Sequence, residues 1–192
     1  MDLIYVIAFF VSVSIAIPLI LAIPDDRRRF AYFIGHSALW IAGAWLYLLI
    51  PSLGPAYRFP DVWTEVYMLF RESRHLQYDL LQNYIRVTNF RDSGVLSSVN
   101  VAYGIAAFPS LHVGFQCFLM FWARRYSLAL SWVLGLVVLA MFVGSILTGW
   151  HYAIDGIAGL LLAALCYRLG IRLAGLDDED IRDGEAADLE RD

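Results

Sequence analysis

Residues 3–23 read LIYVIAFFVSVSIAIPLILAI, a run of 21 residues without a charged side chain. A single membrane crossing requires a helix of about 20 predominantly apolar residues. A secretory signal peptide is the competing interpretation, but the segment is preceded by Met1-Asp2 instead of a basic region, and its apolar stretch is too long. We therefore expect residues 3–23 to form a membrane span, and this expectation decides the fold class.

Four further runs along the chain have the length and composition of membrane spans. One of them is interrupted only by His36, and the last tolerates Asp155 near its start and Arg168 near its end. The four runs cover residues 30–50, 105–123, 127–148 and 152–171. The sequence thus predicts an all-α, polytopic membrane protein, with five transmembrane helices in one bundle.

The overall composition agrees with a membrane protein and excludes several other classes. Hydrophobic residues make up 60% of the chain and charged residues only 17%, whereas soluble domains average about 25% charged residues. A disordered chain, a nucleic-acid-binding module and most cytosolic enzymes are thereby excluded. All 14 basic residues are arginine, which excludes a phosphate-binding P-loop and a Schiff-base lysine. The two cysteines, Cys117 and Cys166, lie in apolar runs and form neither a CxxC metal site nor a disulfide framework.

The acidic charge is concentrated at the C-terminus. Residues 177–192 hold nine acidic residues against two arginines, which leaves residues 1–176 with a net positive charge. We expect residues 1–176 to form a single membrane-embedded catalytic domain. Residues 177–192 are expected to be a disordered, solvated tail, and a tail that binds a partner is the alternative.

The positions of the arginines predict the orientation of the spans. Arginines cluster between spans one and two, between spans three and four, and after span five, at residues 27–29, 124–125, 168 and 172. Alternating spans bring these clusters to one side, which the positive-inside rule makes cytoplasmic. The loop 51–104 and the turn 149–151 then lie outside. We expect an integral protein of a bacterial plasma membrane, with an extracytoplasmic active site and a cytoplasmic C-terminal tail.

The outer loop, residues 51–104, is too long for a simple connector. Its apolar residues recur at helical spacing, at Val62, Val66 and Phe70 and again at Leu76, Leu80 and Tyr84. This pattern predicts one or two amphipathic helices lying on the outer membrane surface. Packing of the same helices against the tops of the spans is the alternative.

Two short segments place polar groups at the outer membrane edge. In residues 148–155 (TGWHYAID), His151 and Asp155 are four residues apart, so on a helix they share a face and can form a hydrogen bond. A carboxylate that accepts from one ring nitrogen leaves the other nitrogen free as a nucleophile or base. The competing interpretation is a buried structural His–Asp pair.

The second segment is residues 108–112 (FPSLH). Pro109 suits the first turn of a helix, and the free N–H groups around Ser110 and Leu111 would favour an anion such as phosphate. His112 lies in the same turn and could donate a proton to a leaving oxygen. The alternative is a capped helix with an incidental histidine. This alternative is weakened because a second histidine is expected at the same pocket.

These two segments carry a resemblance to a known family. AAFPSLHVG, followed some 36 residues later by TGWHYAIDGIAG, resembles the second and third motifs of the phosphatidic acid phosphatase type 2 superfamily, usually written PSGH and SRx5Hx3D. Leucine in place of the motif glycine, together with the HYAID wording, resembles more closely the inositol phosphorylceramide synthase-like (inositolphosphotransferase) branch. The resemblance covers about residues 105–160.

The sequence also departs from the family pattern. The first motif, Lys-x6-Arg-Pro, is absent, and the chain has five expected spans where the family core usually has six. In the third motif, Gly144 and Ser145 stand at the positions of the Ser and the Arg. The charge of a bound phosphate must therefore be met elsewhere. Among the loop arginines we favour Arg86 and Arg91, which come last before the motif. The other candidates are Arg58, Arg71 and Arg74.

The resemblance implies a membrane enzyme that transfers or hydrolyses a phosphoryl group of a lipid phosphate. By analogy, His151 is the nucleophile that forms a phosphohistidine, Asp155 orients it, and His112 protonates the leaving alcohol, while Ser110 and Leu111 bind the phosphate. No cofactor, metal or nucleic acid is expected. The bilayer and a lipid phosphate are the expected partners. A phosphotransferase that uses an alcohol acceptor such as inositol is slightly favoured. The alternative is a phosphatase that acts on phosphatidic acid or a prenyl diphosphate. A non-catalytic membrane scaffold is a third, less favoured interpretation.

Overall fold

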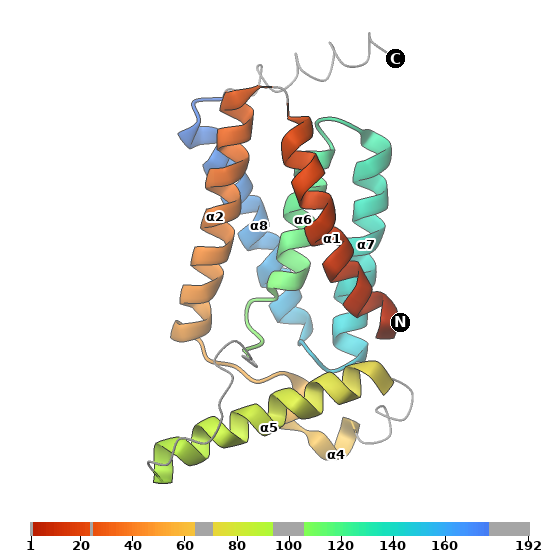
Figure 1. The fold of residues 1–192 in the computed structure, drawn as a ribbon, viewed down its shortest axis with the longest axis vertical. Helices are drawn as coiled ribbons and strands as arrows, with labels where there is room; N and C mark the ends of the chain where they lie inside the picture. The colour runs from red at the N-terminus through yellow and green to blue at the C-terminus, as the bar shows by residue number, and fades with distance from the viewer. Residues whose placement is uncertain (1, 24, 64–70, 94–105, 177–192) are drawn as a thin grey trace.

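The computed structural model describes residues 2–23, 25–63, 71–93 and 106–176. Five long helices lie side by side and alternate in direction, as Figure 1 shows. They are α1 (Asp2–Ala22), α2 (Asp26–Leu49), α6 (Leu111–Ala123), α7 (Leu128–Leu147) and α8 (Ala153–Leu173). The expectation of a helical bundle is confirmed for this part of the chain.

The helices differ in their ability to cross a membrane. Three of the described helices, α2, α7 and α8, are long and apolar enough to span a bilayer. The apolar part described for α1, Val11–Ala22, and the whole of α6 are shorter. At 1.5 Å per residue the 13 residues of α6 reach only about 20 Å, less than the ~30 Å hydrocarbon core.

The expected start of the third span at residue 105 is wrong, because α6 begins only at Leu111. The residue before a proline disfavours helical backbone, and Phe108 precedes Pro109. The backbone of residues 106–108 instead pairs with residues 52–53, as described below.

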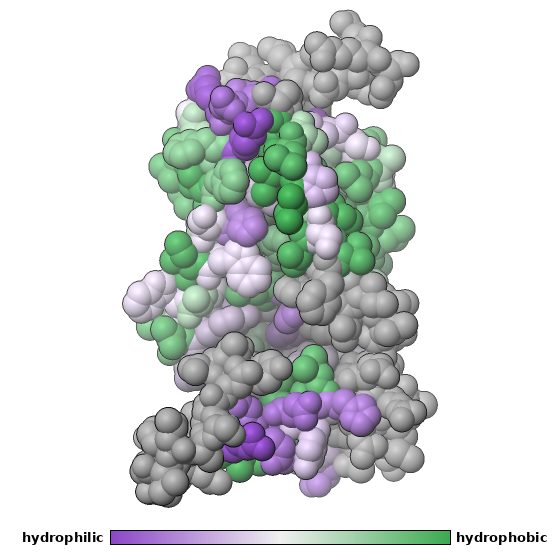
Figure 2. All heavy atoms as spheres, in the orientation of Figure 1, coloured by the Kyte–Doolittle hydropathy of each residue, from purple (hydrophilic) through white to green (hydrophobic). Residues whose placement is uncertain are grey.

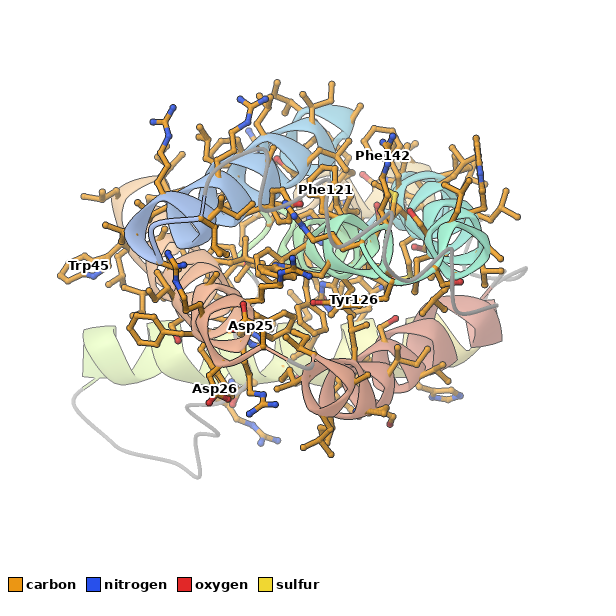
Figure 3. All side chains as sticks on the ribbon, turned by 90° about the horizontal axis from the view of Figure 1, so that it is seen from above. Asp25, Asp26, Trp45, Phe121, Tyr126 and Phe142 are labelled. Atoms are coloured by element: carbon orange, nitrogen blue, oxygen red, sulfur yellow. The ribbon has the colours of Figure 1, made fainter. Side chains whose placement is uncertain are left out.

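The outer surface of the bundle is apolar between two polar ends. In Figure 2 the middle of the visible face is green and pale, and purple gathers at the top and over α5 below. Large apolar side chains are widely exposed, among them Leu21 at 74%, Leu48 at 73% and Trp132 at 71%. Seen from above in Figure 3, the Trp45 side chain points away from the bundle. Such a surface is unfavourable in water and suits contact with lipid tails.

The centre of the bundle is α6. Phe115, Phe118 and Trp122 of this helix are at most 2% exposed, and Tyr32 of α2 packs edge-on against Phe118 and Trp122. Because α6 is covered by α1, α2, α7 and α8, apolar residues occupy nearly its whole circumference. This central position explains why the sequence of so short a helix is as apolar as that of a membrane span.

All three arginine clusters lie at the same end of the bundle, where α1 passes into α2, α6 into α7, and α8 ends (Figure 1). The Arg27 guanidinium donates to the carbonyl oxygen of Gly175 at 2.6 Å, beyond the C-terminus of α8. The Arg125 guanidinium donates to the Tyr167 hydroxyl at 2.6 Å and lies over the ring of Trp122. The predicted clustering is therefore correct, and these arginines also tie the ends of the helices together.

The opposite end carries the short helices α3 (Pro55–Arg58) and α4 (Pro60–Trp63) and the long helix α5 (Arg71–Ser93). Figure 1 shows α5 crossing below this end of the bundle, nearly at right angles to the other helices. Among its residues 75–86, whose side chains the structure describes, Gln77, Leu80 and Asn83 are buried.

The buried face of α5 differs from the predicted one. Of the expected apolar stripe, Leu80 is buried but Leu76 and Tyr84 are exposed, and Val66 and Phe70 lie outside the described residues. Two polar side chains, Gln77 and Asn83, are buried instead, and the Gln77 amide donates to the carbonyl oxygen of Thr148 at the C-terminal end of α7. The amphipathic pattern thus identified a helix here without identifying its contact face.

Candidate active site

Non-helical backbone leads into α6 and positions its first turn. Leu53 and Ala106 form an isolated antiparallel bridge, and the Ala107 N–H donates to the carbonyl oxygen of Ser52 at 3.0 Å. The Phe108 N–H donates to the Ser52 hydroxyl oxygen at 2.8 Å. The segment after α2 thereby holds the segment before α6, although the paired residues lie more than fifty positions apart. Ser110 then occupies the N-cap of α6, and His112 lies in the first turn.

A tight turn between α7 and α8 carries His151. The N–H groups of Trp150 and His151 both donate to the Ser145 carbonyl oxygen, at 2.9 and 3.2 Å. Gly149 has a φ of 73°, a left-handed conformation that glycine adopts without steric cost. The carbonyl oxygen of Gly149 also accepts from the Ala56 N–H at 3.0 Å, so α3 holds the turn from outside.

A close crossing of α6 and α8 brings the two histidine segments together. A Cβ atom on Gly114 would lie 2.9 Å from the Gly159 carbonyl oxygen, and one on Gly159 would overlap the Ser110 carbonyl oxygen. The Ser110 N–H donates to the Asp155 carbonyl oxygen at 2.9 Å and ties the two helix starts together. As a result, the ring centroids of His112 and His151 are only 6.1 Å apart. One bound group can therefore contact both rings.

His151 is buried and is oriented mainly by a backbone carbonyl. Its Nδ1 atom lies 2.8 Å from the Ala107 carbonyl oxygen and 3.7 Å from Oδ2 of Asp155. A carbonyl oxygen can only accept, so Nδ1 carries the proton and the lone pair resides on Nε2. This leaves Nε2 as the nucleophilic or basic nitrogen of the ring.

Asp155 contacts both His151 and the start of α8. Its Oδ2 atom accepts from the Tyr152 N–H at 2.8 Å, and its side chain is buried. The hydrogen bond expected between His151 and Asp155 is absent at 3.7 Å, because His151 precedes the helix and the four-residue spacing argument does not apply to it. A carboxylate at this distance still favours a positive charge on the imidazole ring.

The N-terminus of α6 has the character of an anion site. Ser110 is fully buried, and its hydroxyl oxygen has no hydrogen-bond partner among the described residues. The first N–H groups of any α-helix lack acceptors within the helix, and the helix dipole adds partial positive charge there. Leu111 begins this first turn, and its side chain packs against Gly43 of α2. A hydroxyl donor and backbone donors can together bind phosphate oxygens.

Gln77 of α5 also contacts this region and was not predicted. It is 2% exposed, and its Nε2 donates to the carbonyl oxygen of Thr148 at 2.8 Å, three residues before His151. In the sequence, only its position next to Leu76 of the apolar helical pattern indicated that Gln77 could face the bundle. The Ala107 carbonyl was missed as well, and no sequence signal exists for it, because every residue supplies a carbonyl.

The favoured arginines lie on α5. Arg86 is exposed, and at 3.6 residues per turn it lies about half a turn around the helix from the buried Gln77. Arg91 belongs to α5, but its side chain lies outside the described residues, as do those of Arg71 and Arg74. Arg58 is exposed and lies over the ring of Phe59.

The remaining histidines lie away from this site. His36 is half-buried in α2 and packs against the rings of Tyr32, Phe115 and Phe118. His75 is exposed on α5. Within the described ranges, no three His, Cys, Asp or Glu side chains group in a way that could hold a metal ion.

The geometry provides a buried nitrogen nucleophile, a second histidine near it and a cluster of anion-binding donors. This combination suits transfer of an anionic group through a covalent histidine intermediate. In comparisons with known proteins, a family model described as "PAP2 superfamily" matches residues 1–169. No curated protein and no solved structure matches the chain.

Proposed function

The chain belongs to the PAP2 superfamily, and on this premise we propose that it transfers a phosphoryl group from a lipid phosphate through a phosphohistidine at His151. Family membership indicates phosphatase or phosphotransferase activity on lipid phosphates. The observation that carries the proposal is the convergence of the His112 and His151 rings beside Ser110, with Nδ1 of His151 bonded to the Ala107 carbonyl oxygen. That bond leaves Nε2 available for attack on phosphorus.

The reaction has two displacements at phosphorus. In the first, Nε2 of His151 forms the N–P bond, the bond from phosphorus to the lipid oxygen breaks, and His112 protonates the departing oxygen. In the second, His112 takes the proton of the acceptor, whose oxygen forms a new O–P bond as the N–P bond breaks. Asp155 stabilises the positive charge that His151 carries between the two steps, which its 3.7 Å distance supports.

The phosphate is held by the Ser110 hydroxyl and the N–H groups that begin at Leu111. The hydroxyl oxygen of Ser110 is buried without a partner among the described residues, which a phosphate oxygen would relieve. These donors are neutral, so we further propose that an arginine of α5 compensates the phosphate charge. Arg91 and Arg86 are the candidates, and Arg86 would reach the site only after a rotation of α5, since it is exposed.

The acceptor decides between two activities of this one site. We favour slightly a phosphotransferase that resembles the inositolphosphotransferase branch, with an alcohol such as inositol as acceptor. The alternative is a lipid phosphate phosphatase, acting with water on phosphatidic acid or a prenyl diphosphate. In a deletion strain, lipid mass spectrometry separates the two: a missing headgroup lipid indicates a transferase, and an accumulating lipid phosphate with no missing headgroup indicates a phosphatase.

The chemistry itself is tested with purified protein and a labelled lipid phosphate. We expect a labelled protein that is stable to alkali and labile to acid, as a phosphohistidine is. A wild-type protein without turnover and without this intermediate would contradict the proposal and favour a non-catalytic scaffold.

We also propose that α1 and α6 cross the bilayer with the three long helices, that α5 lies at the outer membrane surface and that the active site is extracytoplasmic. Two observations support this: the exposed apolar belt, and the arginine clusters at the end opposite the histidines. An impermeant thiol reagent on intact cells should label a single cysteine at position 97 and not one at position 125. Labelling of position 125 alone would invert the orientation.

A further inference from the structure

The side chain of Gln77 has one satisfied end and one unsatisfied end. Its Nε2 donates to the Thr148 carbonyl oxygen at 2.8 Å. Rotation of the amide would place two oxygens against each other, so the donor must be the end that faces Thr148. Oε1 is therefore the other end, and it has no hydrogen-bond partner among the residues that the structure describes.

A buried amide oxygen without a partner is costly and calls for an explanation. Gln77 is only 2% exposed, so water at the surface does not supply the missing bond. Its other end is anchored to the turn that carries His151, with Thr148 only three residues before that histidine. Gln77 is thus bonded to the segment that leads into His151.

Gln77 and Ser110 differ in what they can bind. The Ser110 hydroxyl can donate to a phosphate oxygen, whereas an amide oxygen only accepts and is repelled by phosphate oxygens. Oε1 therefore needs a donor, and a hydroxyl group of the acceptor alcohol is a donor that the proposed reaction supplies. In a double displacement the acceptor alcohol takes the place that the leaving alcohol has vacated, so a second hydroxyl of the acceptor would lie beside the reacting oxygen in the second step.

We propose that Gln77 is a specificity-determining residue whose Oε1 accepts a hydrogen bond from a second hydroxyl of a polyhydric alcohol at the reacting centre. The inference rests on the function proposed above. In the second displacement the bound alcohol gives its proton to His112, its oxygen forms the O–P bond, and the N–P bond at His151 breaks. Water and monohydric alcohols react without the contact to Gln77.

The packing of α5 indicates how such an alcohol gains access. The Gln77 oxygen is closed to solvent and belongs to α5, so a ligand reaches it only when part of α5 moves. Over residues 75–86 the contact of α5 with the bundle is narrow, because Gln77, Leu80 and Asn83 are buried while neighbouring Tyr78 is 61% exposed. A narrow contact makes this displacement inexpensive.

The test measures competition between two alcohols at the phosphoenzyme. The full-length protein in detergent receives short-chain phosphatidic acid together with glycerol and 1-propanol at equal concentrations. The measured quantity is the ratio of glycerol phosphate to propyl phosphate. Gln77→Met retains the shape of the side chain without its amide, and we expect the ratio to fall about three- to tenfold, as for the loss of one neutral hydrogen bond.

Two further variants make the result specific. Gln82→Met on the same helix should keep the wild-type ratio, because Gln82 is half-buried and five residues away from Gln77. Gln77→Glu keeps an accepting oxygen and should retain the preference for glycerol, even if the total rate falls.

The possible outcomes separate the inference from the proposed function. If Gln77→Met slows both products equally and leaves the ratio unchanged, Gln77 only supports the turn and the inference is wrong. The same conclusion follows if Gln77→Met does not fold and Gln77→Glu loses the preference for glycerol. If the wild-type protein forms neither product, nor free phosphate, nor a phosphoenzyme, the proposed function itself fails, and the role of Gln77 fails with it.

Discussion

The two ends of the bundle are built in different ways. At the arginine end, short turns join the helices and charged groups are paired within the protein: Arg27 with the Gly175 carbonyl, Arg125 with Tyr167. At the histidine end, α6 starts late and extended segments are bonded across long sequence distances. Buried oxygens of Ser110 and Gln77 lack partners there among the described residues. The arginine end also buries atoms without partners among the described residues, Arg29 Nε and Tyr32 Oη among them. Only at the histidine end does such an atom, the Ser110 hydroxyl oxygen, adjoin the two histidines, where binding of a ligand would offset the cost.

Substitution of His151 should have the largest effect at the histidine end. We expect His151→Ala to abolish turnover and the acid-labile phosphoenzyme, because the variant lacks the nucleophile and not merely a stabilising contact. Labelling with a radioactive lipid phosphate followed by gel electrophoresis measures the intermediate. An active His151→Ala protein with an unchanged labelled band would end the covalent mechanism.

His112→Ala should have the next largest effect. A positioned general acid contributes typically 10²–10⁴-fold, so we expect the rate to fall within that range. With an aryl phosphate, whose leaving group needs little protonation, the phosphoenzyme should still form. Stopped-flow kinetics with poor and good leaving groups provides the measurement, and an equal loss for both would argue against proton donation by His112.

Gly159→Ala tests whether the helix crossing positions the two histidines. A methyl group at this position would overlap the Ser110 backbone, which cannot move as a flexible side chain can. We expect a loss of about 1–3 kcal/mol in stability and about 10²-fold in activity, since a displacement of about 1 Å suffices for the latter. Gly135→Ala is the matched control, because its Cβ would lie 3.4 Å from the Met120 sulfur, an ordinary contact. Similar losses in both variants would remove the special role of the crossing.

The arginines of α5 are expected to contribute less than the histidines. If one of them compensates the phosphate charge, alanine at both Arg86 and Arg91 should lower kcat/KM roughly tenfold, which corresponds to one charge-assisted hydrogen bond. Lysine at the same positions should retain more activity, because it keeps the charge but loses the bidentate fork. Unchanged activity of the double alanine variant would direct the search to Arg58.

The smallest effect on catalysis is expected at the arginine end. Arg27→Ala removes a charge-assisted bond to the carbonyl groups beyond α8, at an exposed site. We expect a loss of about 1 kcal/mol in stability, or a decrease of about 2–4 °C in Tm, with kcat/KM unchanged. Thermal unfolding and turnover in the same detergent measure both quantities. A large loss of activity without loss of stability would contradict the view that the arginine end serves folding and the histidine end serves catalysis.

The sequence predicted the parts of this structure that depend on local pattern. The apolar runs predicted all five long helices, and four of them begin and end within a few residues of the expected positions. The pattern could not predict where α6 begins, because Ala106 and Ala107 are bound by backbone groups of residues 52–53. Backbone bonds between distant segments leave no residue-type signature.

The same limit applies to the candidate site. The expected order of the spans placed His112 and His151 at the same end of the bundle, and their rings lie 6.1 Å apart. The partner of His151 was expected to be Asp155, yet the shorter contact is with the Ala107 carbonyl. The contact of Gln77 with Thr148 joins residues 71 positions apart and requires the packing of α5 against the bundle. Neither contact could be read from a local pattern.

The pairing of residues 52–53 with residues 106–108 has a further consequence, for how the protein can change over evolution. These bonds close the base of the outer loop, so the carbonyl that orients His151 is fixed independently of what lies between. Doubling the length of a flexible closed loop costs only about 0.6 kcal/mol. Changes after α3 that keep the bonds of Ala56 and Gln77 to the turn before His151 can therefore alter which headgroups are admitted, while His112 and His151 keep their positions.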